Sequence, residues 1–154
     1  MKEYIPNGGV EMIITFIGHS NFSEKEKLTI GVLEEIVKDN NVEFFLGGYG
    51  GFDEHALQMA IKYKEKHLNT KIIFVTPYIY KDYFLISGMK RKVDEIIYPE
   101  IENVPKRLAI IRRNEWMIEK ADVVIAYVKY SFGGARMSYD YAFRKNKKII
   151  NLAN

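Results

Sequence analysis

Short apolar runs alternate along the chain with longer stretches in which apolar residues recur every three or four positions. The short runs are typical of buried strands, and the longer stretches are typical of amphipathic helices. We expect strands over Met12–Ile17, Val42–Leu46, Lys71–Thr76, Val93–Tyr98, Asp122–Val128 and Lys148–Leu152. We expect helices over Glu24–Asp39, Phe52–His67, Pro105–Lys120 and Gly133–Lys145, and a mixed segment over Tyr78–Lys92 that could hold a short helix.

The order of these elements predicts the class of fold. Strand and helix alternate throughout, and the expected strands are apolar on both faces, as in a parallel sheet covered on each side by helices. The crossover connections should be right-handed. At 154 residues the chain fits one domain. We therefore predict a single α/β domain with a mainly parallel sheet over residues 12–154, preceded by a lead-in over residues 1–11.

The start of the first expected helix has a recognisable pattern. Ser23 stands before Glu24 and Glu26, and we interpret this as a capping box that begins the helix. Asn40 and Asn41 are expected to end it.

Composition and charge exclude some functions and weaken others. The chain has no cysteine, which removes disulfides, thiolate catalysis and cysteine metal sites and fits a reducing compartment. We find no signal peptide and no apolar run near the roughly 18 residues of a membrane span, so we expect a cytoplasmic protein without a membrane segment. The net charge of +3 is small. The densest basic run, Arg144–Lys148, lies at an expected helix end, and nucleic acid is not a favoured partner.

Candidate chemistry lies where the expected strands end, because ligands of open parallel sheets bind at the carboxyl ends of the strands. Four turns follow these ends: Gly18–Asn21, Gly47–Glu54, Thr76–Tyr78 and Lys129–Arg136. Two of them place paired glycines before a helix, where the backbone can approach a ligand and exposed N–H groups can bind an anion. The turn at Gly47–Gly51 matches neither the dinucleotide fingerprint nor the Walker loop. A purely structural tight turn is therefore an equal alternative there.

Acids and a histidine stand in or beside these turns. Asp53 and Glu54 fall in the first turn of an expected helix, where acids either cap the helix or bind ribose hydroxyls. His19 is the histidine best placed for a site, beside Ser20 at a strand end. No second histidine or carboxylate stands at metal spacing, so we expect no metal site.

A second candidate lies on the helix expected at Pro105–Lys120. Arg113 and Asn114 share one face of it, and an arginine there could clamp a phosphate with two hydrogen bonds. The alternative is an exposed ion pair with Glu115 or Glu119, which would contribute little. Trp116, the single tryptophan, is expected to pack in the core.

The order and spacing of these motifs resemble the SLOG superfamily, and within it the YpsA-like branch. This superfamily unites the DNA-processing protein DprA with the Lonely Guy phosphoribohydrolases. The resemblance covers about residues 12–152 and implies a Rossmann-like sheet whose loops bind a nucleotide or a nucleotide derivative. It rests on Phe16–His19, Phe45–Asp53, Arg113–Ile118, Ala121–Ala126, Gly133-Gly134, Tyr141-Ala142 and Lys148–Ile150.

The chain departs from the Lonely Guy pattern at one catalytic position. In those enzymes an arginine on a helix and a glutamate after a glycine turn carry N-glycosidic hydrolysis, and the resemblance places Arg113 at that arginine. After Gly133-Gly134 there is no glutamate: Ser138 stands near its place, and Asp140 lies two residues on. The departure weighs against phosphoribohydrolase activity and leaves ligand binding untouched.

We therefore expect a binder or sensor of a nucleotide-derived small molecule, ADP-ribose-like, NAD-like or a cyclic nucleotide, with no required cofactor. By analogy with the family we expect a homodimer or a higher homo-oligomer. The alternative is an N-glycosidic hydrolase or transferase acting on nucleosides or nucleotides, with Asp53, Glu54 or Asp140 as its carboxylate. A third hypothesis, a nucleic-acid module like DprA, has only the basic cluster and the tyrosines in its favour. The expected ligand-binding residues are Gly18, His19, Ser20, Gly47, Gly48, Tyr49, Gly50, Asp53, Thr76, Pro77, Tyr78, Arg113, Asn114, Gly133, Gly134, Ala135 and Arg136.

Overall fold

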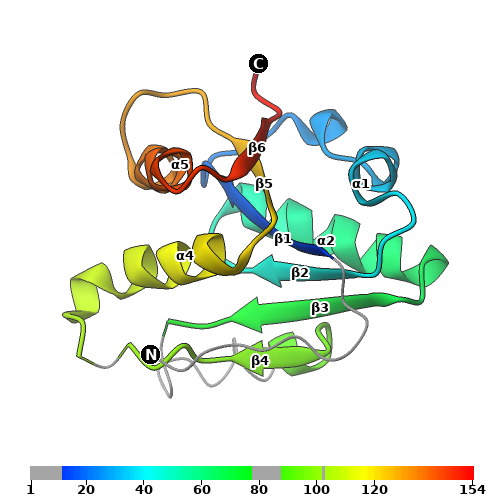
Figure 1. The fold of residues 1–154 in the computed structure, drawn as a ribbon, viewed down its shortest axis with the longest axis horizontal. Helices are drawn as coiled ribbons and strands as arrows, with labels where there is room; N and C mark the ends of the chain where they lie inside the picture. Colours follow the sequence, from blue (N-terminus) through cyan, green and yellow to red (C-terminus); the bar gives the residue numbers. More distant parts are fainter. Residues whose placement is uncertain (1–11, 78–87, 102) are drawn as a thin grey trace.

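The computed structural model describes residues 12–77, 88–101 and 103–154, and its elements carry the labels of Figure 1. The strands are β1 (Met12–Gly18), β2 (Val42–Leu46), β3 (Thr70–Val75), β4 (Glu95–Ile97), β5 (Val123–Tyr127) and β6 (Lys148–Asn151). The helices are α1 (Ile30–Val37), α2 (Gly51–Lys66), α4 (Ala109–Lys120) and α5 (Gly134–Arg144), with short 3-10 turns η1 (Lys25–Lys27) and η2 (Lys106–Leu108).

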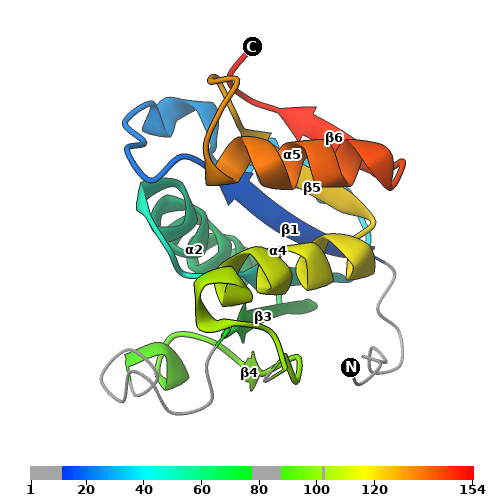
Figure 2. The same ribbon diagram turned by 90° about the vertical axis from the view of Figure 1, so that its left-hand side faces the viewer.

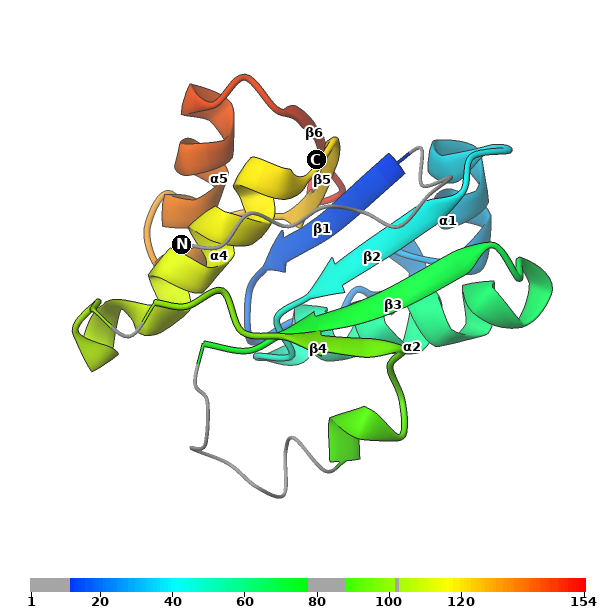
Figure 3. The same ribbon diagram turned by 60° about the horizontal axis from the view of Figure 1, so that its bottom comes forward.

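The described strands form one parallel sheet in the order β4-β3-β2-β1-β5-β6 (Figure 3). From β1 the chain adds β2, β3 and β4 toward one edge, and then returns to add β5 and β6 on the other side of β1. In register, Thr15 of β1 lies between Phe45 of β2 and Val124 of β5. The carboxyl end of β1 is thus the topological switch point, where ligands of open α/β sheets bind.

Both faces of the sheet are covered, as the apolar character of the strands predicts. Alternate side chains such as Phe16 and Phe44 pack against α1 and α2. The intervening side chains face α4 and α5: Phe45 stacks on Trp116 with ring centroids 5.8 Å apart, which confirms the packing role of the tryptophan. Figure 2 shows α4 and α5 side by side on one face and α2 on the other. The predicted single α/β domain with a parallel sheet covered on both faces is confirmed.

The predicted start of the first helix is wrong. The expected range Glu24–Asp39 contains the short turn η1, and α1 begins only at Ile30. Its cap is the hydroxyl of Thr29, which accepts the N–H of Val32 at 3.3 Å, whereas no side chain caps the η1 turn beside Ser23.

A histidine on α2 accounts for the interruption. The Nε2 of His55 lies 3.1 Å from the carbonyl oxygen of Lys25 and 2.8 Å from that of Leu28, and donates to them. These carbonyls are thereby engaged by a side chain distant in sequence, and the chain turns at Leu28 instead of continuing as one helix.

The other predicted strands and helices are present, but α4 begins at Ala109 after the η2 turn rather than at Pro105, and β4 covers only Glu95–Ile97 of the predicted Val93–Tyr98. Asp122 precedes β5 and its carboxylate accepts the N–H of Ile13 at 2.8 Å. The segment Tyr78–Lys92 lies mostly outside the described residues. In the part of the chain that the structure describes, no helix is both long and apolar enough to cross a membrane.

Candidate functional site

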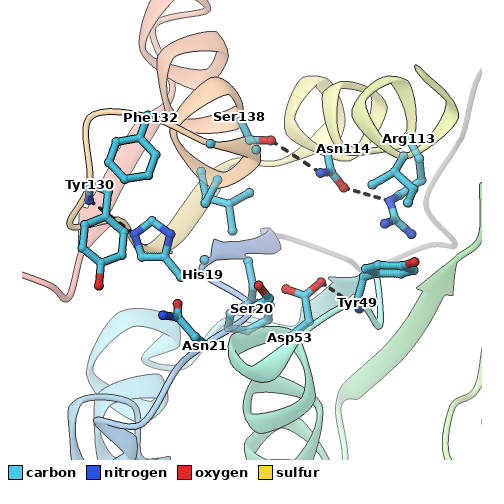
Figure 4. Close-up of a pocket in the computed structure, with 17 residues that line it drawn as sticks. His19, Ser20, Asn21, Tyr49, Asp53, Arg113, Asn114, Tyr130, Phe132 and Ser138 are labelled. Carbon is cyan, nitrogen blue, oxygen red and sulfur yellow. Dashed lines mark hydrogen bonds between the residues drawn. The ribbon is translucent and has the colours of Figure 1, made fainter. Parts of the chain in front are cut away.

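A cleft of about 580 Å³ lies at the carboxyl edge of the sheet, beside the end of β1 (Figure 4). The loops after β1, β2 and β5 meet there with the first turns of α2 and α5. Its size falls within the roughly 300–1,000 Å³ typical of small-molecule sites. It is lined by Phe16, Ile17, Gly18, His19, Ser20, Asn21, Tyr49, Asp53, Ile110, Arg113, Asn114, Tyr130, Phe132, Gly133, Gly134, Ala135 and Ser138.

His19 joins the loop after β1 to the loop after β5. Its Nε2 accepts the backbone N–H of Lys129 at 2.9 Å and that of Tyr130 at 3.4 Å. Because Nε2 is the acceptor, the proton of the neutral ring resides on Nδ1. Burial, and to a smaller extent the charge of Lys129, lowers the pKa of His19 below its ordinary 6.5. The neutral ring thus holds the loop that leads into α5.

The amino terminus of α5 opens onto the cleft. Gly133 caps the helix with φ 94° and ψ 176°, a conformation that favours glycine. A Cβ added at Gly133 or at Gly134 would meet no atom within 4 Å. Among the described residues, no acceptor contacts the N–H groups of Gly134, Ala135 and Arg136, and the first turn contains no acid. Free N–H groups and the helix dipole make this turn suited to an anion.

Asp53 lies in the first turn of α2. Among the described residues it is the one acidic side chain that lines the cleft. Its Oδ2 accepts the N–H of Tyr49 at 3.1 Å. Burial raises the pKa of Asp53 from 3.8 to about 6, against the opposing effects of the Arg113 charge and the Tyr49 N–H. A buried carboxyl with a strongly perturbed pKa inside a cleft is a frequent property of functional sites.

The other two catalytic candidates lie elsewhere. Glu54 is exposed on α2 and does not line the cleft. Asp140 lies 3.4 Å from Nε of Arg136, with its side chain half exposed, and does not line the cleft either. The predicted ligand residue Arg136 does not line the cleft either: its side chain pairs with Asp140, and only its backbone N–H belongs to the open turn of α5.

Arg113 is 1% exposed and braces the floor of the cleft. Its Nη1 donates to the carbonyl oxygens of Gly47 at 2.9 Å and Val75 at 2.7 Å, and its Nε donates to Oδ1 of Asn114 at 2.8 Å. Asn114 in turn donates from Nδ2 to Oγ of Ser138 at 3.5 Å. These contacts connect the loop after β2 to α4 and α5 and engage the guanidinium with the protein.

The alternative of an exposed ion pair at Arg113 is wrong. The neighbouring Arg112 makes that pair instead, with Nη1 lying 3.0 Å from Glu115 and 4.0 Å from Glu119. The reason is helical phase: Arg112 faces solvent on α4, whereas Arg113 faces the sheet.

The glycines of the turn after β2 pack against the protein itself. A Cβ at Gly47 would lie 2.8 Å from Cζ of Arg113, and one at Gly50 would lie 2.8 Å from the Cα of Ser20. Gly48, with φ 66°, would meet Phe74 at 2.7 Å. None of these three predicted ligand residues lines the cleft, although Tyr49 between them does.

Several other predicted residues also lie away from the cleft. Thr76 and Pro77 are buried after β3 and do not line it, and Tyr78 is outside the described residues. Conversely, two exposed aromatic residues that line the cleft, Tyr130 and Phe132, were not among the predicted ligand residues. Both stand in the loop after β5, within the candidate turn Lys129–Arg136, but no pattern in the sequence marks their rings as exposed. Also missed were Phe16, Ile17, Asn21, Ile110 and Ser138.

Comparison with known proteins supports the fold and a distant homology. No family model matches the sequence. Among curated proteins, the chain is similar to the uncharacterized SPbeta prophage-derived protein YoqJ of Bacillus subtilis (strain 168). The two are 29% identical over 137 residues, covering 77% of this chain and 79% of YoqJ.

Solved structures of DNA processing protein A (DprA) share the architecture. The Helicobacter pylori protein, described for its single-stranded DNA binding mode, superposes with a TM-score of 0.64 at 21% identity, covering 90% of this chain and 63% of that chain. The Streptococcus pneumoniae protein gives 0.65 at 13% identity, covering 90% and 49%. The chain thus spans only part of either DprA. At these identities the likeness establishes the fold alone, a Rossmann-like domain like that of DprA.

Proposed function

We propose that this protein binds a nucleotide-derived small molecule in the cleft, with a phosphate at the amino terminus of α5. The open first turn of α5 is the observation on which the proposal depends. The backbone N–H groups of Gly134, Ala135 and Arg136 donate to no acceptor among the described residues. The ADP-ribose-like, NAD-like or cyclic nucleotide ligands implied by the resemblance contain such a phosphate. A role of this kind fits the YpsA-like branch, to which we assign the chain as part of the proposal.

The wall of the cleft formed by α2 favours contact with a sugar rather than with a second phosphate. The Asp53 carboxyl would repel an anion once ionised, whereas it can accept a hydrogen bond from a ribose hydroxyl. Arg113 offsets part of the Asp53 charge, but its contacts to Gly47 and Val75 make it a brace of the cleft floor rather than a phosphate clamp. We therefore orient the ligand with its phosphate toward α5 and hydroxyls toward α2.

The test adds a negative charge where the phosphate is expected. In Gly134→Asp the new side chain enters open space at the first residue of α5, where an acid favours the helix dipole and folding is preserved. Gly31→Asp is the matched control, because Gly31 is an exposed residue in the first turn of α1 and lies outside the cleft.

Affinities for ADP-ribose, AMP and a cyclic nucleotide would be measured by calorimetry and by thermal shift. We expect at least one to bind the wild type and Gly31→Asp equally. Gly134→Asp should weaken that ligand more than about 10-fold, because like charges in contact cost several kcal/mol. Absence of binding by any of them at millimolar concentration, or equal binding by both variants, would contradict the proposal.

A second candidate function, cleavage or transfer at an N-glycosidic bond, is favoured by one observation. A pKa of about 6 brings the titration of the Asp53 carboxyl close to neutral pH inside the cleft, which suits general acid–base chemistry. Incubation with nucleoside monophosphates, followed by chromatography for free base, tests it. Release that disappears in Asp53→Asn would support it, and absence of release from the wild type would leave binding as the function.

A further inference from the structure

Two exposed aromatic rings stand in the loop that leads into α5. Tyr130 is 41% exposed and Phe132 is 71% exposed, and both line the cleft. They stack on each other with centroids 5.6 Å apart and an interplanar angle of 19°. Tyr130 also lies 4.6 Å from the ring of His19, so the pair continues a row of rings that begins in the buried part of the site (Figure 4).

The row is held in place before any ligand arrives. His19 accepts the backbone N–H of Tyr130 through Nε2 at 3.4 Å and that of Lys129 at 2.9 Å, so ring contact and hydrogen bonding fix the same loop. A preorganised surface of this kind spares the ligand the cost of ordering the loop. His19 is in this sense a positioning residue for the two rings.

The rings are also close to the open helix terminus. Phe132 directly precedes Gly133, and chain geometry limits its Cα to about 7.6 Å from that of Gly134. A flat aromatic surface and a set of free N–H groups are therefore neighbours on one wall. These are the chemical complements of a base and of a phosphate joined by a ribose.

Exposure of an aromatic ring does not by itself indicate a ligand subsite. Phe143, at the other end of α5, is 70% exposed, yet it lies outside the cleft. The difference at Phe132 is its stacking on Tyr130 and its place beside the open turn. Phe143 therefore supplies a control of the same residue type and similar exposure, at the opposite end of α5.

We propose that Tyr130 and Phe132 form a stacking subsite for the base of a nucleotide whose phosphate lies at the amino terminus of α5. The subsite rests on the proposed function, since it assumes that a phosphorylated ligand occupies the cleft. Stacking accepts any flat heterocycle, because every base has a π face. The subsite thus selects nucleotides over sugar phosphates without reading which base is present.

The experiment compares two probes that differ only in the base, AMP and ribose 5-phosphate, by calorimetry on the full chain. Wild type should bind AMP more tightly than ribose 5-phosphate. Phe132→Ala should weaken AMP about 5- to 100-fold, the range for loss of one base stack, and leave ribose 5-phosphate within about twofold. Phe132→Tyr should restore AMP binding, and Phe143→Ala should match the wild type for both probes.

The outcomes separate this inference from the proposed function. If the wild type binds neither probe but binds ADP-ribose or a cyclic nucleotide, the proposed function stands and the subsite is overturned. If it binds none of these ligands, the proposed function fails and the subsite with it. If AMP binds but Phe132→Ala and Phe143→Ala behave alike, the stacking subsite alone is overturned. The same holds if Tyr49→Ala rather than Phe132→Ala removes the preference for AMP, because the base would then lie on the other wall. Tighter binding of a single-stranded oligonucleotide than of AMP would also overturn it, because the rings would then serve a polymer.

Discussion

The two glycine turns of this protein share a backbone conformation and differ in what surrounds them. Gly50 caps α2 with φ 91° and ψ 174°, and Gly133 caps α5 with φ 94° and ψ 176°. At α2, the N–H of Gly51 donates to Ser20 and that of Phe52 donates to His19, both to backbone carbonyls. At α5 the corresponding groups face the cleft.

The difference teaches that a glycine pair before a helix specifies a turn and not a ligand. At α2 the missing side chains make room for the loop after β1, and Asp53 and Glu54 make the first turn unfavourable for an anion. At α5 the same conformation leaves open space and N–H groups without described acceptors. One turn is a packing junction, and the other is a candidate anion site.

The largest effect should come from Gly50→Ala. The positive φ is strained for alanine by about 1–3 kcal/mol, and the contact with Ser20 adds about 1–3 kcal/mol of overpacking. We expect the free energy of unfolding to fall by about 2–6 kcal/mol in urea denaturation. Gly31→Ala, whose Cβ would meet only Thr29 Oγ1 at 3.7 Å, is the control and should be neutral or slightly stabilising. If Gly50→Ala lowers the free energy of unfolding by less than about 1 kcal/mol, the α2 turn accommodates a methyl group without a clash.

Asp53→Asn should produce the next largest effect, with the opposite sign. A pKa of about 6 in the folded state against the ordinary 3.8 means that the ionised carboxylate costs up to about 3 kcal/mol of stability. The unfolded chain ionises first as pH rises, so this cost is absent below pH 3.8, grows between 3.8 and 6, and is complete above that. We expect Asn, which retains an acceptor for the Tyr49 N–H, to stabilise the protein at pH 7 and to have little effect near pH 4.

Urea denaturation at the two pH values measures this difference. Asp140→Asn is the control, because its ion pair with Arg136 is half exposed and should contribute less than about 1 kcal/mol at pH 7. Destabilisation by Asp53→Asn at pH 7 would show that the carboxylate is a net stabilising partner of Arg113.

The smallest effect should come from Gly134→Ala. The new methyl group enters open space at a helical residue, so the substitution should raise the free energy of unfolding by about 0.5–1 kcal/mol through the lower entropy of the unfolded chain. Thermal denaturation would detect this as a small increase in Tm. A clear decrease would mean that the α5 turn is as tightly packed as the α2 turn, and the contrast between them would be lost.

Much of the fold could be predicted because strands and helices depend on the pattern of apolar residues that are close together in the sequence. Phe44 and Phe45 face opposite sides of the sheet, and a short run that is apolar on both faces predicts a strand buried on both. The start of α1 could not be predicted in the same way. It depends on His55, which reaches the carbonyls of Lys25 and Leu28 from another helix.

The candidate site likewise contains residues that could be predicted from local sequence and residues that could not. Gly18, His19, Asp53, Gly133 and Gly134 were predicted from their places at strand ends and helix starts, and the structure brings them to one cleft. The rings that face the same cleft, in contrast, were not predicted, because an aromatic residue in a loop has no periodicity that reveals its exposure.

By itself, the sequence determined the order of strands and helices, the carboxyl edge on which the loops meet, and the presence of two glycine turns. Only the tertiary structure decided which turn is closed, that Arg113 is a brace, and that Asp53 has a raised pKa. The physical reason is distance along the chain. Arg113 and Gly47 are 66 residues apart, yet one hydrogen bond joins them. Contacts of that kind exist only once the sheet and its helices have assembled.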